Sequence, residues 1–241
     1  TQYNIAIGLM SGTSMDGIEA TIIETDGNEF KRTECCSSKK YDSYTLKILN
    51  EAIKNPLNFI NNKEDLKKLN NLVTKEHATV VRKLIKQFDK KVDIIGFHGQ
   101  TIYHNAEENL SIQIGDGKLL AEITGLNVIF NFRENDINKG GQGAPLAPIY
   151  HLSMIKSLNH KLPASILNLG GVGNITWYDG KDLIGFDTGP ANGLMDIFIQ
   201  RKIGSEFDLN GNLASKGIPN FEIINQVLSH NFFKKNYPKS L

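Results

Sequence analysis

The chain has 241 residues, of which 40% are hydrophobic and 22% charged, as in an ordinary globular protein. Its formal net charge of +1 gives no strong field, so we expect neither a nucleic acid nor an anionic membrane as a partner. No apolar run reaches the roughly 20 residues of a membrane span, and the first residues lack the positive charge of a signal peptide. The adjacent Cys35 and Cys36 are badly placed for a mutual disulfide. Together these features predict a soluble, cytoplasmic protein.

The first forty residues predict three short strands, at 5–10, 18–24 and 30–37. Residues 18–24 alternate between apolar and polar side chains, as a half-buried strand does. A turn of small and polar residues at 11–17 and the hairpin signal Asp26-Gly27 separate the strands. The chain therefore opens with a β-meander and not with a βαβ unit.

Two helices are expected next, a short one over 46–53 and a long one over 66–88. Asn55-Pro56 ends the first, and the polar stretch 58–63 separates the two. The long helix carries an apolar stripe with spacings of three and four: Leu66, Leu69, Val73, His77, Val80, Leu84 and Phe88. We expect His77 to lie at the edge of the core and not to bind a metal, because no second ligand type accompanies it.

Three further strands each end in polar residues. The strands are predicted at 94–97, 110–114 and 128–132, and a short helix lies before the last one. The residues that follow them are His98-Gly99-Gln100-Thr101, Gly115-Asp116-Gly117 and Arg133. Open α/β sheets bind ligands beyond the carboxyl ends of their strands, so these residues are candidates for a binding site.

The second half of the chain repeats the opening pattern. After a glycine loop at 140–145, a helix at 147–158 and a linker at 159–163, the order of strand, small-residue turn, strand, Asp-Gly turn and strand returns over 165–186. Helices are expected at 194–203 and 221–228. This weak repeat predicts two related lobes, which we divide at residues 1–160 and 161–241.

Two glycine-containing turns are candidates for phosphate binding. In Gly12-Thr13-Ser14-Met15-Asp16-Gly17 the backbone N–H groups and hydroxyls could meet an anion, and Asp16 could hold a divalent cation through water. Gly170-Gly171-Val172-Gly173-Asn174 forms a similar turn, and neither matches a Walker A or a dinucleotide fingerprint. Each turn alone could equally be a polar hairpin, but the pair suggests two hairpin tips around one phosphate chain.

The remaining candidates are Asp187, Arg133, His98 and Gln142. Asp187-Thr188-Gly189-Pro190 follows a strand and precedes a helix. Asp187 could therefore lie at a site for phosphate or water, or it could only cap the helix N-terminus. Arg133 could bind a carboxylate in bidentate fashion, or form a structural ion pair with Glu134 or Asp136. His98 could be no more than a hydrogen-bonded loop residue.

Taken in order, these motifs resemble those of the anhydro-N-acetylmuramic acid kinases. The matching segments are IGLMSGTSMDG, GFHGQT, QIGDG, FRENDINKGGQGAPL, LNLGGVGNIT and FDTGPAN. They run from residue 5 to about residue 196. Six motifs in register are far more specific than any one of them.

The resemblance implies an α/β fold of the actin-like (ribonuclease H-like) two-lobe ATPase type. It implies a first lobe over 1–160 with most of the sugar site, and a second lobe from 161 that is incomplete, because family members continue into an adenosine-binding segment. The implied reaction uses ATP, Mg²⁺ and water to convert 1,6-anhydro-N-acetylmuramic acid to N-acetylmuramic acid 6-phosphate in peptidoglycan recycling. It also implies a homodimer for the complete protein.

The family's roles carry over to matching positions of this sequence. Asp187 would be the general base that activates water. The sugar would meet His98, Gln100, Arg133 and Gln142, with Arg133 at the lactyl carboxylate. Asp16 would lie near the metal. The ATP-binding set would be Gly12, Thr13, Ser14, Met15, Asp16, Gly17, Ile18, Glu19, Gly170, Gly171, Gly173 and Asn174.

Three positions depart from the family pattern: Asn131 replaces an Asp, Ala191 a Gly and Gly173 an Ala. Asn131 removes a charge close to Arg133, which bears on substrate orientation. The missing adenosine-binding segment leaves an alternative in which this chain is a non-catalytic remnant or fragment that binds a sugar or a partner without turnover.

Overall fold

A computed structural model describes residues 2–12, 15, 17–105, 107–158 and 161–241. The chain forms two compact units, Thr1–Gly143 and Ala144–Leu241. None of the helices in the described part of the chain combines the length and the apolar character that crossing a membrane requires.

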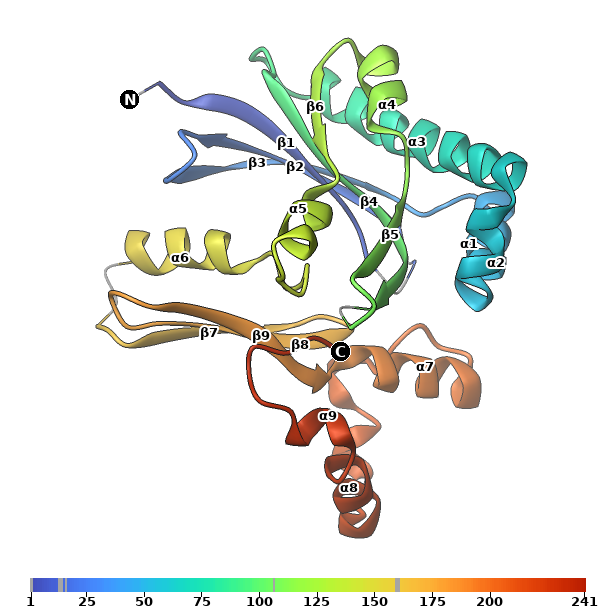
Figure 1. The fold of residues 1–241 in the computed structure, drawn as a ribbon, viewed down its shortest axis with the longest axis vertical. Helices are drawn as coiled ribbons and strands as arrows, with labels where there is room; N and C mark the ends of the chain where they lie inside the picture. Colours follow the sequence, from blue (N-terminus) through green and yellow to red (C-terminus); the bar gives the residue numbers. More distant parts are fainter. Residues whose placement is uncertain (1, 13–14, 16, 106, 159–160) are drawn as a thin grey trace. The chain divides into compact units, whose positions relative to one another are not determined.

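The first unit is built on a mixed sheet whose main path runs β3-β2-β1-β4-β5 (Figure 1). Its described strands are β1 (Asn4–Ser11), β2 (Ile18–Thr25), β3 (Phe30–Lys39), β4 (Ile94–Asn105), β5 (Leu110–Ile114) and β6 (Asn127–Phe130). The first three form the expected antiparallel meander, and β4 pairs parallel with β1. On its other edge β4 pairs with β6 over its first half and with β5 over its second half. The sheet is therefore centred on β1 and β4.

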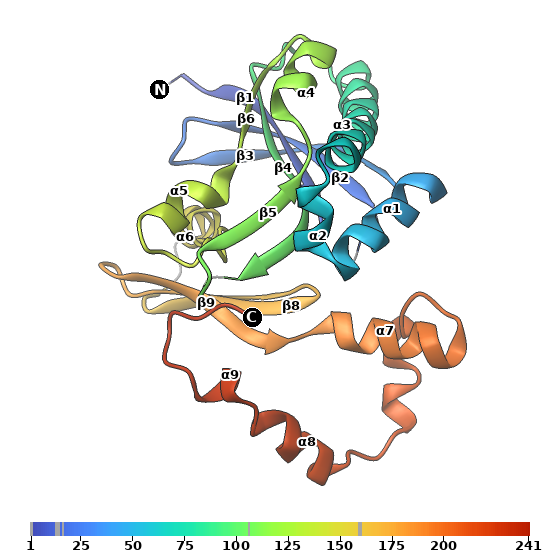
Figure 2. The same cartoon turned by 45° about the vertical axis from the view of Figure 1, so that its right-hand side comes forward.

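Four helices lie together on one side of this sheet (Figures 1 and 2). They are α1 (Ser43–Lys54), α2 (Pro56–Asn61), α3 (Lys63–Lys86) and α4 (Gly117–Thr124), while α5 (Phe132–Asn138) follows β6. The stretch expected to be a polar connection is mostly helix, because Pro56 at the first position of α2 has the backbone geometry that starts a helix. Asn62 then caps α3 by accepting hydrogen bonds from the backbone of Glu64 and Asp65.

The core of the first unit lies between the sheet and α3. The predicted stripe of α3 is fully buried at Leu69, Val73 and Leu84, and it packs on strand residues such as Ile95. His77 is also fully buried, so it lies within the core and not at its edge. Its Nδ1 donates to the backbone oxygen of Val73 over 2.8 Å, which accounts for a histidine in an apolar setting.

Two strand ends differ from the sequence prediction. β4 does not stop at Phe97 but continues to Asn105, so His98 and Gln100 lie inside a strand. Pairing with β5 supplies the hydrogen bonds that extend it. β6 ends at Phe130, and Arg133 lies in the first turn of α5. Asn131 makes this change of direction with a left-handed φ of 63°, a conformation that Asn tolerates.

The second unit also begins its sheet with an antiparallel meander, β7-β8-β9. Its strands are β7 (Ala164–Leu169), β8 (Val172–Tyr178) and β9 (Leu183–Pro190), and its helices are α6 (Pro148–Ser157), α7 (Asn192–Ile203), α8 (Phe221–Leu228) and α9 (Asn231–Lys234). Two short 3₁₀ turns, Leu209–Gly211 and Ala214–Lys216, join α7 to α8. β9 extends past the predicted strand end, so Asp187 lies within it.

The boundary between the units falls before α6, whereas the sequence analysis placed it after that helix. α6 belongs with the second unit because it packs on that unit's sheet. His151 of α6 is hydrogen-bonded to the hydroxyl of Thr176 over 2.7 Å. Pro148 lies directly on Gly185 of β9, where any side chain would collide with it.

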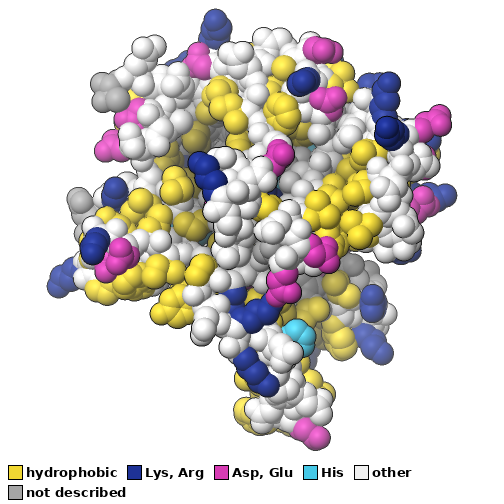
Figure 3. Space-filling model, viewed as in Figure 1, with side chains coloured by type: hydrophobic (Ala, Val, Ile, Leu, Met, Phe, Trp, Pro, Cys, Tyr) yellow, Lys and Arg dark blue, Asp and Glu magenta, His cyan; other side chains and the backbone are white. Residues whose placement is uncertain are grey.

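Apolar side chains remain exposed on the helices of the second unit. On α7 they include Leu194 and Phe198, and on α8 they include Phe221, Ile223 and Leu228. Figure 3 shows hydrophobic side chains on the surface of α8, at the lower end of the view. The described part of the second unit therefore covers its apolar surface much less completely than the first unit does.

Candidate functional site

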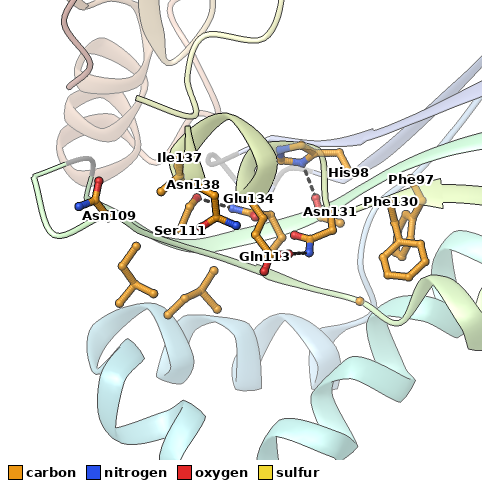
Figure 4. Close-up of a pocket in the computed structure, with 14 residues that line it drawn as sticks. Phe97, His98, Asn109, Ser111, Gln113, Phe130, Asn131, Glu134, Ile137 and Asn138 are labelled. Carbon is orange, nitrogen blue, oxygen red and sulfur yellow. Dashed lines mark hydrogen bonds between the residues drawn. The ribbon is translucent and has the colours of Figure 1, made fainter. Parts of the chain in front are cut away.

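A cavity of about 450 Å³ opens in the first unit, among β4, β5 and α5 (Figure 4). Its lining mixes polar with aromatic and aliphatic side chains: Phe97, His98, Gly99, Asn109, Leu110, Ser111, Ile112, Gln113, Gly115, Phe130, Asn131, Glu134, Ile137 and Asn138. A cavity of this size with convergent polar groups has the character of a small-molecule site. Of the predicted sugar-binding residues, His98 lines it directly.

His98 and Arg133 form a hydrogen-bonded pair beside this cavity. Arg133 Nε donates to His98 Nε2 over 2.9 Å, and His98 Nδ1 donates to the backbone oxygen of Gly99 over 2.7 Å. Burial, together with the Arg133 guanidinium, lowers the pKa of His98 to about 4. His98 is therefore a neutral imidazole with a fixed tautomer, which suits it to orienting Arg133 better than to transferring protons.

Arg133 also holds the glycine loop. Its Nη1 donates to the backbone oxygen of Gly143 over 2.5 Å, while Gly143 N donates to Asp136 Oδ2 over 2.7 Å. Gly141 lies so close to the Asp136 carboxylate that no side chain would fit there. Gln142 is half-buried within this loop. The loop is thus fastened to α5, and Asp136 is a contributor that the sequence analysis considered only as an ion-pair partner.

Asn131 lines the cavity and bonds to a neighbouring acid. Its side-chain amide donates to Glu134 Oε2, and both residues face the cavity (Figure 4). An Asp at this position would place a second carboxylate against Glu134, so the departure from the family pattern removes a repulsion here.

Gln100 does not line the cavity. It is fully buried on the core side of the sheet, and its Nε2 donates to the backbone oxygen of Gly12 over 2.9 Å. Gln100 is thereby bonded to the start of the first glycine turn and not placed beside His98.

The first glycine turn is described in part, because Thr13, Ser14 and Asp16 lie outside the described residues. Met15 has a left-handed φ of 55°, and its N–H donates to the backbone oxygen of Gly12 over 3.1 Å. A side chain at Gly17 would lie 2.6 Å from the backbone oxygen of Lys39, so only glycine fits there.

The two residues that follow this turn open β2. The Ile18 side chain is fully buried in the core, whereas Glu19 is exposed. The Ile18 side chain therefore serves the core, and any contact of this residue with ATP would use its backbone.

The second glycine turn packs against the start of α7. Asn192 N donates to the backbone oxygen of Gly170 over 2.9 Å, and Gly193 N donates to that of Gly171 over 3.2 Å. A side chain at Gly173 would lie 2.8 Å from the Thr188 hydroxyl. The first N–H groups of α7 are therefore hydrogen-bonded to this turn. They could bind a phosphate only if these bonds were broken.

Asp187 lies opposite Asn174 across the β8–β9 pair and is only 8% exposed. Its Oδ2 accepts a hydrogen bond from Leu241 N over 2.9 Å, and its own N–H donates to the backbone oxygen of Lys239. Asp187 does not cap α7, whose N-cap residue is Ala191. The buried Asn174 Oδ1 has no hydrogen-bond partner among the described residues, so this oxygen can accept a hydrogen bond from a bound molecule.

The sequence analysis missed the polar side of β5. Ser111 and Gln113 line the cavity and bond to each other over 2.7 Å. The signal was available, because Leu110-Ser-Ile-Gln-Ile alternates apolar and polar residues and so presents both polar side chains on one face. In the part of the chain that the structure describes, no three His, Cys, Asp or Glu side chains form a group that could hold a metal ion.

Comparison with known proteins identifies related sequences along nearly the whole chain. Residues 4–241 match the family described as anhydro-N-acetylmuramic acid kinase. Curated relatives with that name include one from Zymomonas mobilis, 40% identical across 98% of this chain and 67% of the relative. Those from Pelagibacter ubique and Rhodospirillum rubrum are each 41% identical, across 95% and 98% of this chain and 63% and 62% of the relatives. The chain thus spans about two thirds of the length of these relatives.

A solved structure of an exopolyphosphatase-like protein is 12% identical and is matched across 95% of this chain and 62% of its own. Its TM-score of 0.42 is too low to support a conclusion about the fold.

Proposed function

This chain belongs to the anhydro-N-acetylmuramic acid kinase family, and we propose that the protein converts 1,6-anhydro-N-acetylmuramic acid, ATP and water to N-acetylmuramic acid 6-phosphate and ADP. The observation that carries this proposal is the match over residues 4–241, with relatives named for this kinase at 40% or 41% identity. This match favours a kinase over the alternative of a fragment that binds a sugar or a partner without turnover.

Asp187 is the proposed general base. It takes a proton from water, whose oxygen attacks the anomeric carbon, the bond from that carbon to the bridging oxygen breaks, and this oxygen receives the γ-phosphoryl group while ADP leaves. The role is supported by a buried carboxylate that β9 holds in place, with Oδ2 accepting the Leu241 N–H.

The cavity of the first unit is the proposed sugar site. Its amide and hydroxyl side chains, such as Ser111 and Gln113, suit the hydroxyl and acetamido groups of an amino sugar. Arg133 is the proposed partner of the lactyl carboxylate, because His98 and Gly143 hold its guanidinium in one orientation. Gln142 is proposed as a further sugar contact from the glycine loop.

ATP is the proposed phosphoryl donor, bound by Gly12 to Glu19 and by Gly170, Gly171, Gly173 and Asn174. The close approach at Gly17, where a side chain would collide with the Lys39 backbone oxygen, is compatible with a turn that brings backbone near a ligand. A divalent cation, proposed to be Mg²⁺ near Asp16, would neutralise phosphate charge when bound, and it commonly takes its ligands from phosphates and water.

The proposal extends to the architecture and the setting. Two antiparallel meanders, β1-β2-β3 and β7-β8-β9, support an actin-like two-lobe fold with one meander in each lobe. Peptidoglycan recycling is the proposed pathway, and a homodimer is the proposed form of the complete protein.

The test is release of ADP by the intact protein with and without 1,6-anhydro-N-acetylmuramic acid. We expect sugar-dependent release, and a loss of roughly 10²–10⁴ in kcat for Asp187→Asn. The matched control is Asp182→Asn, an exposed Asp near the β8–β9 turn that undergoes the same change of charge. Equal activity of the two variants would remove Asp187 from the mechanism, and no sugar-dependent release would refute the activity.

A further inference from the structure

A β-bulge in β4 gives its neighbouring residues different roles. Leu9 of β1 pairs with Phe97, but the next pair is Ser11 with Gln100, so β4 has one residue more than β1 between them. Gly99 accommodates this with φ of +74°, and a side chain there would lie 2.6 Å from the Ile114 backbone oxygen. As a result His98 lines the cavity, whereas Gln100 does not and is fully buried beside Ser11, its partner in β1.

The buried amide of Gln100 is bonded at both ends. Its Nε2 donates to the backbone oxygens of Gly12 over 2.9 Å and Thr101 over 3.3 Å, and its Oε1 accepts from the Tyr41 hydroxyl over 3.3 Å. The carbonyl of Gly12 can only accept, so the amide has one orientation that satisfies these partners. A buried polar group left without a partner is costly, so this arrangement fixes Gly12 relative to β4.

Tyr41 bonds to the carbonyl end of the Gln100 amide. It lies between β3 and α1 and is only 6% exposed. Burial is the main cause that raises the pKa of Tyr41, so its hydroxyl remains protonated and able to donate to Gln100. Ser11, which precedes Gly12, is also buried and donates to the backbone oxygen of Gly99 over 3.0 Å. Gln100 therefore bonds to Gly12 directly, Tyr41 bonds to Gln100, and Ser11 ties the residue before Gly12 to β4.

The far end of the turn is held by the same region of the chain. Gly17 lies against the backbone oxygen of Lys39, two residues before Tyr41. The Lys39 ammonium pairs with Glu76 of α3, and Glu76 also accepts from Asp42 N over 3.3 Å. The segment from Lys39 to Asp42 is therefore fastened to α3 and supports both Gly12 and Gly17.

We propose that Gln100 and Tyr41 are positioning residues for ATP: they hold the carbonyl of Gly12, the first residue of the proposed phosphate-binding segment, without touching the sugar. This inference rests on the proposed role of Gly12 to Glu19 in binding ATP. It replaces the expectation that Gln100 contacts the sugar. A Gly12 backbone that is fixed before ATP binds needs no ordering at that residue, so loosening it weakens ATP binding and leaves sugar binding unaffected.

The experiment compares Gln100→Met, Gln100→Glu and Tyr41→Phe in the intact protein. Both Gln100 variants lose the donor to Gly12, and we expect each to raise the KM and the calorimetric Kd for ATP roughly tenfold, with the KM for the sugar within about twofold of wild type. Tyr41→Phe keeps that donor and is expected to have a smaller effect in the same direction. Thr33→Val is the control, because it removes a hydrogen bond to the Ile22 backbone oxygen elsewhere in the same sheet.

Three outcomes would overturn the inference. A raised KM for the sugar with unchanged ATP affinity would make Gln100 a sugar contact. A lowered Tm with both KM values unchanged, as expected for Thr33→Val, would make its role purely structural. A wild-type protein that binds no ATP would refute both this inference and the proposed function. A wild-type protein that binds ATP without sugar-dependent turnover would refute only the function, since ATP affinity still tests Gln100 and Tyr41.

Discussion

The sheets of the two units each contain an antiparallel meander of three strands, but the units bury very different amounts of apolar surface. In the first, α3 lays a continuous apolar stripe on the sheet, and the buried cluster extends from Ile7 to Leu120. In the second, the buried hydrophobic side chains among the described residues are Ile155, Ile199 and Phe232. The comparison shows that a meander buries a large apolar cluster here only where a helix with a matching stripe covers it.

The cause is visible in the helices themselves. The stripe of α3 repeats over 24 residues with its polar residues on the opposite side. α7 carries apolar side chains all around, so Leu194, Met195 and Phe198 remain exposed whichever side packs on the sheet. We therefore expect the first unit to be much the more stable. Trp177, the single tryptophan and a residue of β8, reports on the second unit by fluorescence.

Shortening an apolar side chain should have the most different effects on stability in the two units. Leu84→Ala in α3 removes a fully buried side chain, and we expect it to lower the free energy of unfolding of the first unit by about 2–5 kcal/mol. Ile223→Ala in α8, where the side chain is more than half exposed, should change stability by no more than about 0.5 kcal/mol. Urea unfolding followed by peptide-resolved hydrogen exchange and by Trp177 fluorescence measures both. Comparable losses would show that the apolar face of α8 is covered in solution.

Acidification should weaken the first unit. Burial lowers the pKa of His77 to about 4, and burial with Arg133 does the same for His98. The unfolded chain takes up these protons near pH 6.5 and the folded unit only near pH 4, so stability is complete above pH 6.5 and is lost as the pH falls toward 4. The loss is on the order of 3 kcal/mol for each histidine.

Urea titrations at pH 7.5, 6 and 5 measure this loss. His77→Leu is the comparison variant, because it fills the same apolar site without a titrating group and should remove about half of the pH dependence, leaving the part due to His98. A wild-type stability that stays constant or rises between pH 6.5 and 4.5 would contradict this explanation.

The smallest expected effect compares two equivalent glycines. Gly125 ends α4 in the first unit and Gly204 ends α7 in the second, with φ of 70° and 77° and no atoms near an added Cβ. Alanine should cost each helix about 1 kcal/mol, because only glycine adopts this conformation readily. Because we expect the second unit to be the less stable, the same cost should be a larger fraction of its free energy of unfolding, which Trp177 fluorescence measures. Clearly unequal costs in kcal/mol would point to contacts at one of the two helix ends.

Much of the fold could be predicted from local patterns. The strands of both meanders and the stripe of α3 follow from periodicity and turn residues, and the helices expected at 194–203 and 221–228 are found at Asn192–Ile203 and Phe221–Leu228. The misplaced ends, at Phe97 and at Phe186, have one cause. Both strands continue because a neighbouring strand, β5 or β8, pairs with the polar residues beyond, and a partner distant in sequence leaves no local signal.

The candidate site divides in the same way. The residue types at positions 98, 100, 133 and 187 were identifiable as candidates, and the family membership that supports them is confirmed by the comparisons. Their assigned roles remain predictions. That His98 faces the cavity while Gln100 holds Gly12 could not be predicted, because it depends on one extra residue in the pairing of β1 with β4.

The sequence by itself determined the family, the meander in the sheet of each unit, and the chemical groups available for a site, since these depend on residue type and local spacing. Only the tertiary structure decided which side of β4 each polar residue faces, which unit α6 joins, and how incompletely the second unit is covered. Those features arise from strand register and from packing between segments far apart in the chain, where a shift of one residue exchanges buried and exposed faces.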